Sequence, residues 1–190
     1  MIPRLALLAV LIGISGCSSM KPEDFAGRQP KLLIEEYFAG RTRAWGIFQD
    51  RFGQLRRQFE VEIEGSWDDG TLTLVEDFLY DDGETEQRVW RITKTGEHGY
   101  EGRAEGVLGV AEGRAYGNAL NWSYRFALEV GDDTWNVAFD DWLFLQSDGV
   151  LINRAEVTKF GFKLGEVTLV FHNDADVSAQ AASFTGIAAE

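Results

Sequence analysis

The chain has 190 residues, 45% of them hydrophobic and 13% aromatic, which is enough apolar material for the packed core of about one domain. This composition excludes intrinsic disorder as a description of the whole chain. Eighteen Lys and Arg against 31 Asp and Glu leave a net charge of −13, and a phosphate backbone repels that sign. We therefore expect no nucleic-acid partner.

Residues 1–16 are predicted to be a lipoprotein signal peptide. One basic residue, Arg4, precedes an apolar run from Leu5 to Ile14 that is too short to span a bilayer and is typical of a signal sequence. The run ends in Ile14-Ser15-Gly16-Cys17, a lipobox, in which small residues admit the signal peptidase and the cysteine thiol is diacylated. The alternative is a buried thiol after an ordinary signal peptide, but Cys17 is the only cysteine and stands where the motif requires it.

The lipobox also predicts a location. Acyl chains such as palmitate on Cys17 each contribute about 0.8 kcal/mol per buried methylene, so the anchor holds an acidic body at a membrane. Ser18 stands where an inner-membrane retention signal has Asp, so we expect a bacterial outer-membrane lipoprotein that faces the periplasm. Residues 17–29 are predicted to be the acylated cysteine and a tether. A lone cysteine excludes an internal disulfide.

A single domain is predicted over residues 30–174. Pro30 at a first-turn position, apolar residues at helical spacing and Gly40 as a stop predict one short N-terminal helix. Between Thr42 and Asn173 apolar residues alternate and Gly-containing turns recur, a pattern typical of a meandering antiparallel sheet of about ten strands. Residues 175–190, rich in Ala and Ser, are predicted to be a disordered tail.

Turn residues predict the register of the first hairpins. If Asp69-Gly70 is a two-residue turn, Ile63 lies opposite Glu76 and the apolar face continues into the next strand. If Asp81-Asp82-Gly83 is a three-residue turn with Gly83 left-handed, Glu76 lies opposite Arg88. A carboxylate and a guanidinium are thus expected to form an ion pair on the inward face.

The strand count and the alternation predict an all-β fold, a lipocalin-like antiparallel up-and-down barrel, because closure hides both sheet edges. Small residues alternate within Gly102–Gly106 and within Ala111–Gly117, and bulky rings such as Trp122 occupy the following strand. The small residues either seat these rings or leave a cavity, and the pattern leaves both interpretations open.

Catalytic and metal-binding patterns are sparse. His98 and His172 are the only imidazoles and lack metal-ligand spacing, so neither a metal nor a cofactor is expected. No nucleophile elbow or dinucleotide fingerprint occurs. Asp140 and Asp141 are expected to form a structural ion pair with Arg154, and acid-base work by one of them, if it were desolvated, is the alternative.

Several further motifs occur together in the chain: Glu76-Asp77-Phe78, Asp82-Gly83-Glu84, Arg88-Val89-Trp90, Gly117-Asn118-Ala119-Leu120-Asn121-Trp122-Ser123-Tyr124, Asp140-Asp141-Trp142, Asn153-Arg154 and Thr158-Lys159-Phe160-Gly161. With the lipobox, this set resembles the bacterial lipoproteins catalogued as domain of unknown function 3833, over roughly residues 25–173. The resemblance implies a periplasm-facing lipoprotein. Members often appear alongside fatty-acyl-modifying enzymes, which favours a lipid-related role.

We therefore expect a lipocalin-like binding protein, rather than an enzyme, that holds an apolar ligand such as a fatty acyl chain. The alternatives are an isomerase or hydratase at the barrel mouth, with Glu76, Asp140 or Asp141 as general acid or base, and a non-binding envelope scaffold. An apolar cavity favours the first, a desolvated carboxylate beside an arginine the second, and a filled barrel the third. The candidate ligand-binding residues are Glu76, Arg88, Trp90, Ala104, Ala115, Trp122, Tyr124, Trp142 and Arg154.

Overall fold

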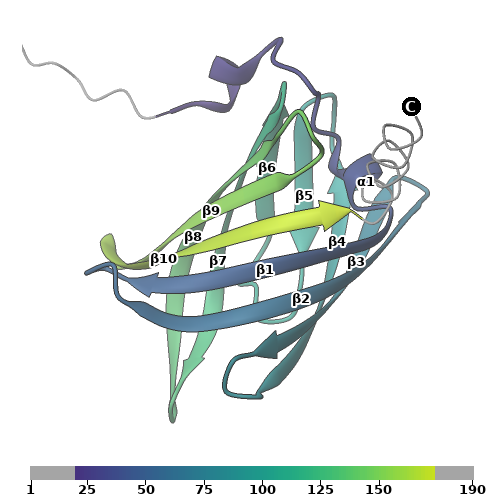
Figure 1. Cartoon of the computed structure of the whole chain (residues 1–190). Coiled ribbons are helices and arrows are strands. Elements are labelled where there is room, and N and C mark those ends of the chain that lie inside the picture. The colour runs from purple at the N-terminus through teal and green to yellow at the C-terminus, as the bar shows by residue number, and fades with distance from the viewer. Residues whose placement is uncertain (1–19, 174–190) are drawn as a thin grey trace, which may run out of the picture.

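Ten antiparallel strands close into one barrel in the computed structural model, which describes residues 20–173 (Figure 1). The strands are β1 (Gly40–Asp50), β2 (Leu55–Asp68), β3 (Thr71–Tyr80), β4 (Thr85–Lys94), β5 (Gly99–Arg103), β6 (Ala111–Tyr116), β7 (Ala119–Val130), β8 (Asp133–Leu145), β9 (Leu151–Lys159) and β10 (Phe162–Asn173). Each strand pairs with its neighbour in the sequence, and β1 pairs with β10, so closure leaves no free edge. The predicted all-β, lipocalin-like up-and-down barrel is confirmed.

The register of the first hairpins follows the turn residues. Asp69 and Gly70 have φ of 43° and 76°, as a two-residue primed turn requires, and Ile63 lies opposite Glu76. Gly83 has φ of 85°, a left-handed conformation that glycine adopts at little cost, and Glu76 lies opposite Arg88. Both predicted registers are confirmed.

An N-terminal segment covers one end of the barrel, which we call the closed end. It contains the predicted short helix, α1 (Ile34–Tyr37), and buries the side chains of Leu32 and Phe38. The helix begins at Ile34 and not near Pro30, because the N–H of Leu32 donates to the carbonyl of Gly117 (2.8 Å) and the chain before Ile34 stays extended. No helix within residues 20–173 has the length and apolar character of a membrane span.

Glu35 of α1 fixes this segment to the barrel wall. Its carboxylate accepts hydrogen bonds from the ammonium of Lys94 and, at 2.8 Å, from the hydroxyl of Tyr100. Burial opposes the charged form, but the ammonium of Lys94, a backbone hydrogen bond and the hydroxyl of Tyr100 together outweigh it and hold the pKa of Glu35 below its usual value. The closed end is therefore held by a charged contact as well as by apolar packing.

Part of the predicted tether, residues 20–29, lies against the outside of the barrel beside the closed end (Figure 1). The 3₁₀ turn η1 (Pro22–Phe25) places the ring of Phe25 5.8 Å from that of Trp142 and 5.5 Å from that of Phe144. Gly117 admits this segment, since a Cβ there would lie 1.9 Å from the carbonyl oxygen of Phe25. The predicted signal peptide, Cys17 and the predicted 175–190 tail fall outside the described residues.

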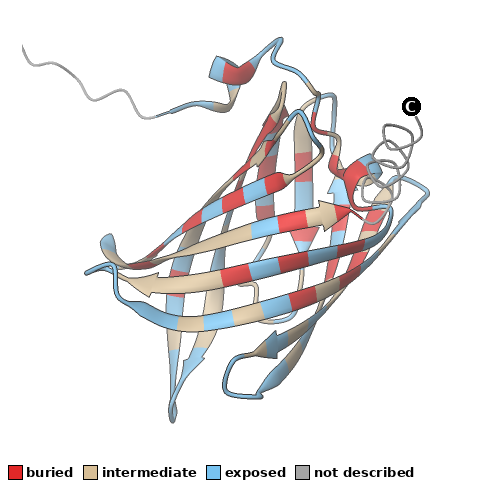
Figure 2. Cartoon of the chain, viewed as in Figure 1, coloured by how far each residue is buried: buried red, intermediate tan, exposed pale blue. Residues whose placement is uncertain are grey.

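The half of the barrel next to the closed end is filled by side chains (Figure 2). Trp122 is buried in this half, and a Cβ on Gly102 or Gly113 would lie 2.5 or 2.4 Å from its indole. These two glycines therefore seat a ring and leave no cavity there, which decides the question that the sequence left open for this half.

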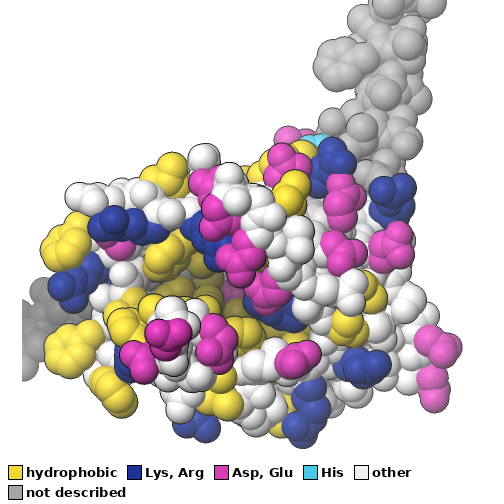
Figure 3. Space-filling model, turned by 90° about the horizontal axis from the view of Figure 1, so that it is seen from below, with side chains coloured by type: hydrophobic (Ala, Val, Ile, Leu, Met, Phe, Trp, Pro, Cys, Tyr) yellow, Lys and Arg dark blue, Asp and Glu magenta, His cyan; other side chains and the backbone are white. Residues whose placement is uncertain are grey.

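The opposite end, which we call the open end, is formed by the turns after β1, β3, β7 and β9 and by the loop 104–110. The interior near this end is less densely filled. Several inward aromatic side chains of this half keep partial exposure, namely Phe59, Phe78, Tyr80, Phe126 and Phe139, whereas Val137 and Val157 are buried. Figure 3, which views the molecule from below, shows a hollow with largely hydrophobic walls. The barrel is thus plugged at one end and hollow at the other.

Candidate functional site

Four polar side chains meet inside the barrel, near the middle of their strands. Glu76, Arg88, Tyr124 and Asp141 belong to β3, β4, β7 and β8, and each occupies an inward position of the strand alternation. The charge of Arg88 lowers the pKa of Glu76 and that of Asp141, and the charges of all three residues act on the pKa of Tyr124. The four groups therefore lie within electrostatic range of one another. We call these four residues the lumen cluster.

Arg88 is held from three sides. Its Nη2 donates to Oε1 of Glu86 (2.5 Å), and its guanidinium carbon lies 5.1 and 4.8 Å from the ring centroids of Phe78 and Phe126. Glu76 faces Arg88 across the two strands, as expected, but the ion pair within 4.0 Å is with Glu86. The buried Nε of Arg88 has no hydrogen-bond partner among the described residues. A fixed cation with an unused donor thus faces the lumen.

The two carboxyls of the cluster are desolvated. Burial raises the pKa of Glu76 to about 7, with the charge of Arg88 lowering it and that of Glu86 raising it. Burial, followed by the charge of Asp140, raises the pKa of Asp141 to about 8, and the Asn153 side chain and Arg88 lower it only in part. Near neutral pH, Asp141 is therefore mostly protonated and Glu76 is partly so.

Two further polar atoms in this region lack partners. Oδ1 of Asp141 and Oδ1 of Asn153 are buried without a hydrogen bond within the described part of the chain. Buried polar atoms in native proteins are usually paired, with protein, water or ligand. Together with Nε of Arg88 they make the lumen wall receptive to a polar group.

Aromatic rings extend from the cluster toward the open end. Tyr124 stacks parallel to Phe139 at 4.9 Å and meets Trp90 edge to face at 5.4 Å. Phe59 and Phe78 lie farther along the same interior, with ring centroids 5.9 Å apart. The site is therefore a polar patch at the inner end of an apolar passage.

Most of the sequence-predicted binding residues come together in the interior. Glu76, Arg88 and Tyr124 belong to the lumen cluster, and Trp90 and Trp122 pack beside it with their rings 5.7 Å apart. The predicted alanines also face inward: Ala115 is buried in the filled half, whereas Ala104 is only partly buried.

Trp142 and Arg154, also predicted as binding residues, do not face the lumen. They lie opposite each other on the outer face of β8 and β9, where Nε of Arg154 lies 2.6 Å from Oε1 of Glu166. The expected ion pair of Arg154 with an acid of the Asp140-Asp141 pair is therefore wrong. Strand alternation places the side chain of Asp141 inside the barrel. The guanidinium of Arg154 donates both of its hydrogen bonds to the carboxylate of Glu166 on the adjacent strand.

Sequence reasoning missed Asn153 and Glu86. Asn153 is a polar residue between the buried Leu151 and Ala155 in a strand with strict alternation, so the alternation alone could have placed it inside. Glu86 shares the inward face of β4 with Arg88, and the same rule applied to that strand would have found it.

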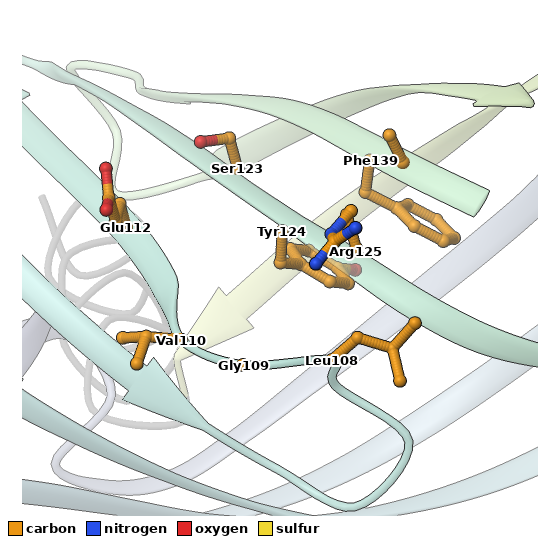
Figure 4. Close-up of a pocket in the computed structure, with 9 residues that line it drawn as sticks. Leu108, Gly109, Val110, Glu112, Ser123, Tyr124, Arg125 and Phe139 are labelled. Atoms are coloured by element: carbon orange, nitrogen blue, oxygen red, sulfur yellow. The ribbon is translucent and has the colours of Figure 1, made fainter. Parts of the chain in front are cut away.

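A second hollow of about 480 Å³ lies in the barrel wall, and Tyr124 and Phe139, which also line the lumen, belong to its lining (Figure 4). It forms where the loop 104–110 meets β7 through the backbone contact of Val107 with Phe126 and the hydrogen bond from Leu108 N to the carbonyl of Arg125 (2.8 Å). Its lining residues are Leu108, Gly109, Val110, Glu112, Ser123, Tyr124, Arg125, Ala138 and Phe139. This hollow is open to solvent and contains none of the desolvated carboxyls, so the lumen is the stronger candidate.

Within residues 20–173 no three His, Asp or Glu side chains are grouped so that they could hold a metal ion. His98 lies outside the lumen cluster, where its ring stacks on Tyr116 at 3.9 Å and its Nδ1 lies 2.8 Å from the carbonyl oxygen of Ala115.

The sequence profile of a family described as "Protein of unknown function (DUF3833)" matches residues 11–173. The match covers the lipobox and the whole barrel. No curated protein matches the chain.

Proposed function

The chain belongs to the DUF3833 family of proteins of unknown function, and we propose that it binds an apolar ligand with one polar end, such as a fatty acyl chain, in its barrel. The observation that carries this proposal is the unequal filling of the barrel. One half is packed around Trp122, and the other is hollow and lined with hydrophobic side chains (Figure 3). This hollow also argues against a filled scaffold.

The apolar passage suits the chain of such a ligand. From Glu76 to Tyr80 at the open end, β3 runs four residues, or about 13 Å at the usual rise of a strand. Phe59, Phe78 and Phe139 line this stretch and are partly exposed without a ligand. Covering them with methylene groups removes apolar surface from water, worth about 25 cal/mol per Å².

The lumen cluster suits the polar end. Arg88 can donate Nε–H to an oxygen of the ligand, and protonated Asp141 can donate or accept beside it. A buried donor that finds its partner only in the ligand favours a ligand with an oxygen at this depth over a plain hydrocarbon.

The lipobox supports an anchored location. Acylation of Cys17 would hold the protein at the outer membrane, facing the periplasm.

The test of binding uses two tryptophan substitutions on β10. Val167 faces the hollow, whereas its neighbour Thr168 faces outward. Val167→Trp should lower the affinity for a fluorescent long-chain fatty acid at least about tenfold while the circular dichroism spectrum is kept, and Thr168→Trp should leave the affinity unchanged. Equal affinities for the two variants, or a wild-type protein that binds no fatty acid, would reject the lumen as the site.

A second candidate function is an isomerase or hydratase reaction on a lumen ligand. The specific observation in its favour is that Glu76 and Asp141, with raised pKa values of about 7 and 8, lie near Arg88. Asp140, the third candidate acid from the sequence, faces outward and is therefore not a candidate for catalysis in the lumen. Bound lipid recovered after incubation in D₂O should gain mass with the wild-type protein and not with Asp141→Asn if the protein catalyses proton transfer.

A further inference from the structure

Two neighbouring turns at the open end expose large apolar side chains. Phe52 in the turn after β1 is 73% exposed, Phe160 in the turn after β9 is 88% exposed, and Phe162 beside it is 74% exposed. Leu55, just after the first turn, is also exposed. Single exposed apolar residues are normal on a protein surface, but four in one place indicate an interaction surface.

These side chains form one patch because β1 and β10 are paired. The N–H of Arg51 donates to the carbonyl of Leu164 (2.9 Å), which ties the two turns together. At the left of Figure 3, hydrophobic and basic side chains project side by side from this part of the rim. We call the set Arg51, Phe52, Leu55, Lys159, Phe160 and Phe162 the rim patch.

The basic members of the patch lie against aromatic rings. The guanidinium carbon of Arg51 lies 4.8 Å from the ring centroid of Phe52. Nζ of Lys159 lies 3.8 Å from the ring centroid of Trp135 on β8 and 5.7 Å from that of Phe160. Within residues 20–173 neither cation lies within 4.0 Å of a carboxylate. The patch is thus positive on a chain whose net charge is −13.

The rest of the rim has the opposite charge. Asp81 and Asp82 lie in the turn after β3, and Asp132 and Asp133 lie at the turn after β7. An anionic surface therefore attracts one side of the rim and repels the other, which gives the molecule a preferred orientation on it.

The backbone at Phe160 gives a further reason to regard the patch as functional. Its φ of 52° is left-handed, a conformation that a bulky side chain adopts only at a cost and that Gly or Asn adopts readily. The ring that this costly backbone carries is almost fully in water. The barrel gains little packing from it, so a partner that covers the ring would account for a phenylalanine at this position.

We propose that the rim patch docks the open end onto the surface of a bilayer that contains anionic phospholipid. The phenylalanine rings enter the boundary between headgroups and acyl chains, and Arg51 and Lys159 bind lipid phosphates. Docked in this way, the mouth of the hollow lies against the membrane. The docking surface does not depend on whether the lumen binds a ligand.

The experiment places a solvent-sensitive fluorophore on a single cysteine in the full chain with Cys17→Ser. In one protein the label replaces a rim residue, through Phe162→Cys, and in the other it sits at the closed end, through Ser147→Cys. Vesicles of phosphatidylcholine with phosphatidylglycerol should shift the emission of the rim label to the blue and leave the closed-end label unchanged. Phosphatidylcholine alone should give a much smaller shift, and added salt should weaken the response.

Matched substitutions then test the patch itself. Phe52→Ser with Phe160→Gly should reduce vesicle partitioning at least about tenfold, and glycine suits the turn, so the fold is kept. Arg51→Gln with Lys159→Gln should remove the preference for phosphatidylglycerol, whereas Val167→Trp should still dock. The proposal is overturned if only the label at residue 147 shifts to the blue, or if the label at residue 162 does not shift. It is also overturned if the variants partition like the wild type, or if the protein forms a dimer without vesicles that hides the rim label.

Discussion

Glu76 and Arg88 face each other across β3 and β4 inside the barrel, yet the guanidinium gives its short hydrogen bond to Glu86 on its own strand. One cation therefore serves more than one buried acid, because Asp141 also experiences its charge. The acid that is not directly paired, Glu76, keeps a pKa of about 7.

Arg88→Met should therefore be strongly destabilising. Removing one partner of a buried charge network costs roughly 3–5 kcal/mol, since the remaining acids lose their counter-charge. Glu76→Gln in the same protein should restore part of that loss, because it removes one of the stranded acids. A double-mutant cycle from urea unfolding measures this coupling, and strictly additive effects would contradict the shared-cation arrangement.

Asp141→Asn should change how stability depends on pH. The pKa of Asp141 is about 8 in the fold and about 3.9 in an unfolded chain, so the fold favours the neutral form. The stabilisation of the fold that comes from the neutral form of Asp141 is complete below about pH 4. It is lost as the pH rises to about 8. The variant should match the wild type at pH 4 and exceed its stability at pH 8, by a few kcal/mol as an order of magnitude.

The matched control is Asp140→Asn, one residue away on the outer face of β8. It changes the same charge but should raise the stability at pH 8 much less, because its own carboxyl is exposed. Urea unfolding between pH 4 and 8 compares the two. Equal effects of both substitutions would show that Asp141 is not the desolvated group.

Gly102→Ala and Gly113→Ala should each cost about 1–3 kcal/mol, because the added methyl would meet the indole of Trp122 in the filled half. Gly96→Ala is the control, since nothing lies within 4 Å of a Cβ there. Trp122→Phe should relieve part of the strain. Thermal melts of the four variants check this, and unchanged melting temperatures at positions 102 and 113 would mean that Trp122 does not fill that half.

Cys17→Ala should abolish acylation and leave the protein soluble or unprocessed, because the lipobox needs its thiol. Membrane fractionation with metabolic palmitate labelling measures this. Recovery of the variant in the outer membrane at wild-type levels would contradict the anchor.

The fold was predictable because strand alternation and turn chemistry agree along the chain. Asp69-Gly70 and Gly83 determine the register that brings Glu76 opposite Arg88, and period two then says which residues face inward. The same rule would have placed Trp142 and Arg154 outside.

The remaining features depend on contacts between strands far apart in the sequence. Arg88 could have paired with Glu76 or with Glu86. The local sequence pattern does not predict which of two acids at similar distances forms the ion pair. Phe25 showed no periodicity that would predict its contact with Trp142, since a single buried ring in a 3₁₀ turn leaves no repeat to detect.

The central claim is that the hollow half of the barrel holds a ligand with an apolar chain and a polar end. Native mass spectrometry of the purified full chain, followed by extraction and identification of whatever is bound, tests it most directly. The account predicts one bound acyl-type molecule per chain, retained by Thr168→Trp and lost from Val167→Trp. A wild-type protein that is bare and takes up no added fatty acid, or a ligand equally retained by both variants, would contradict it.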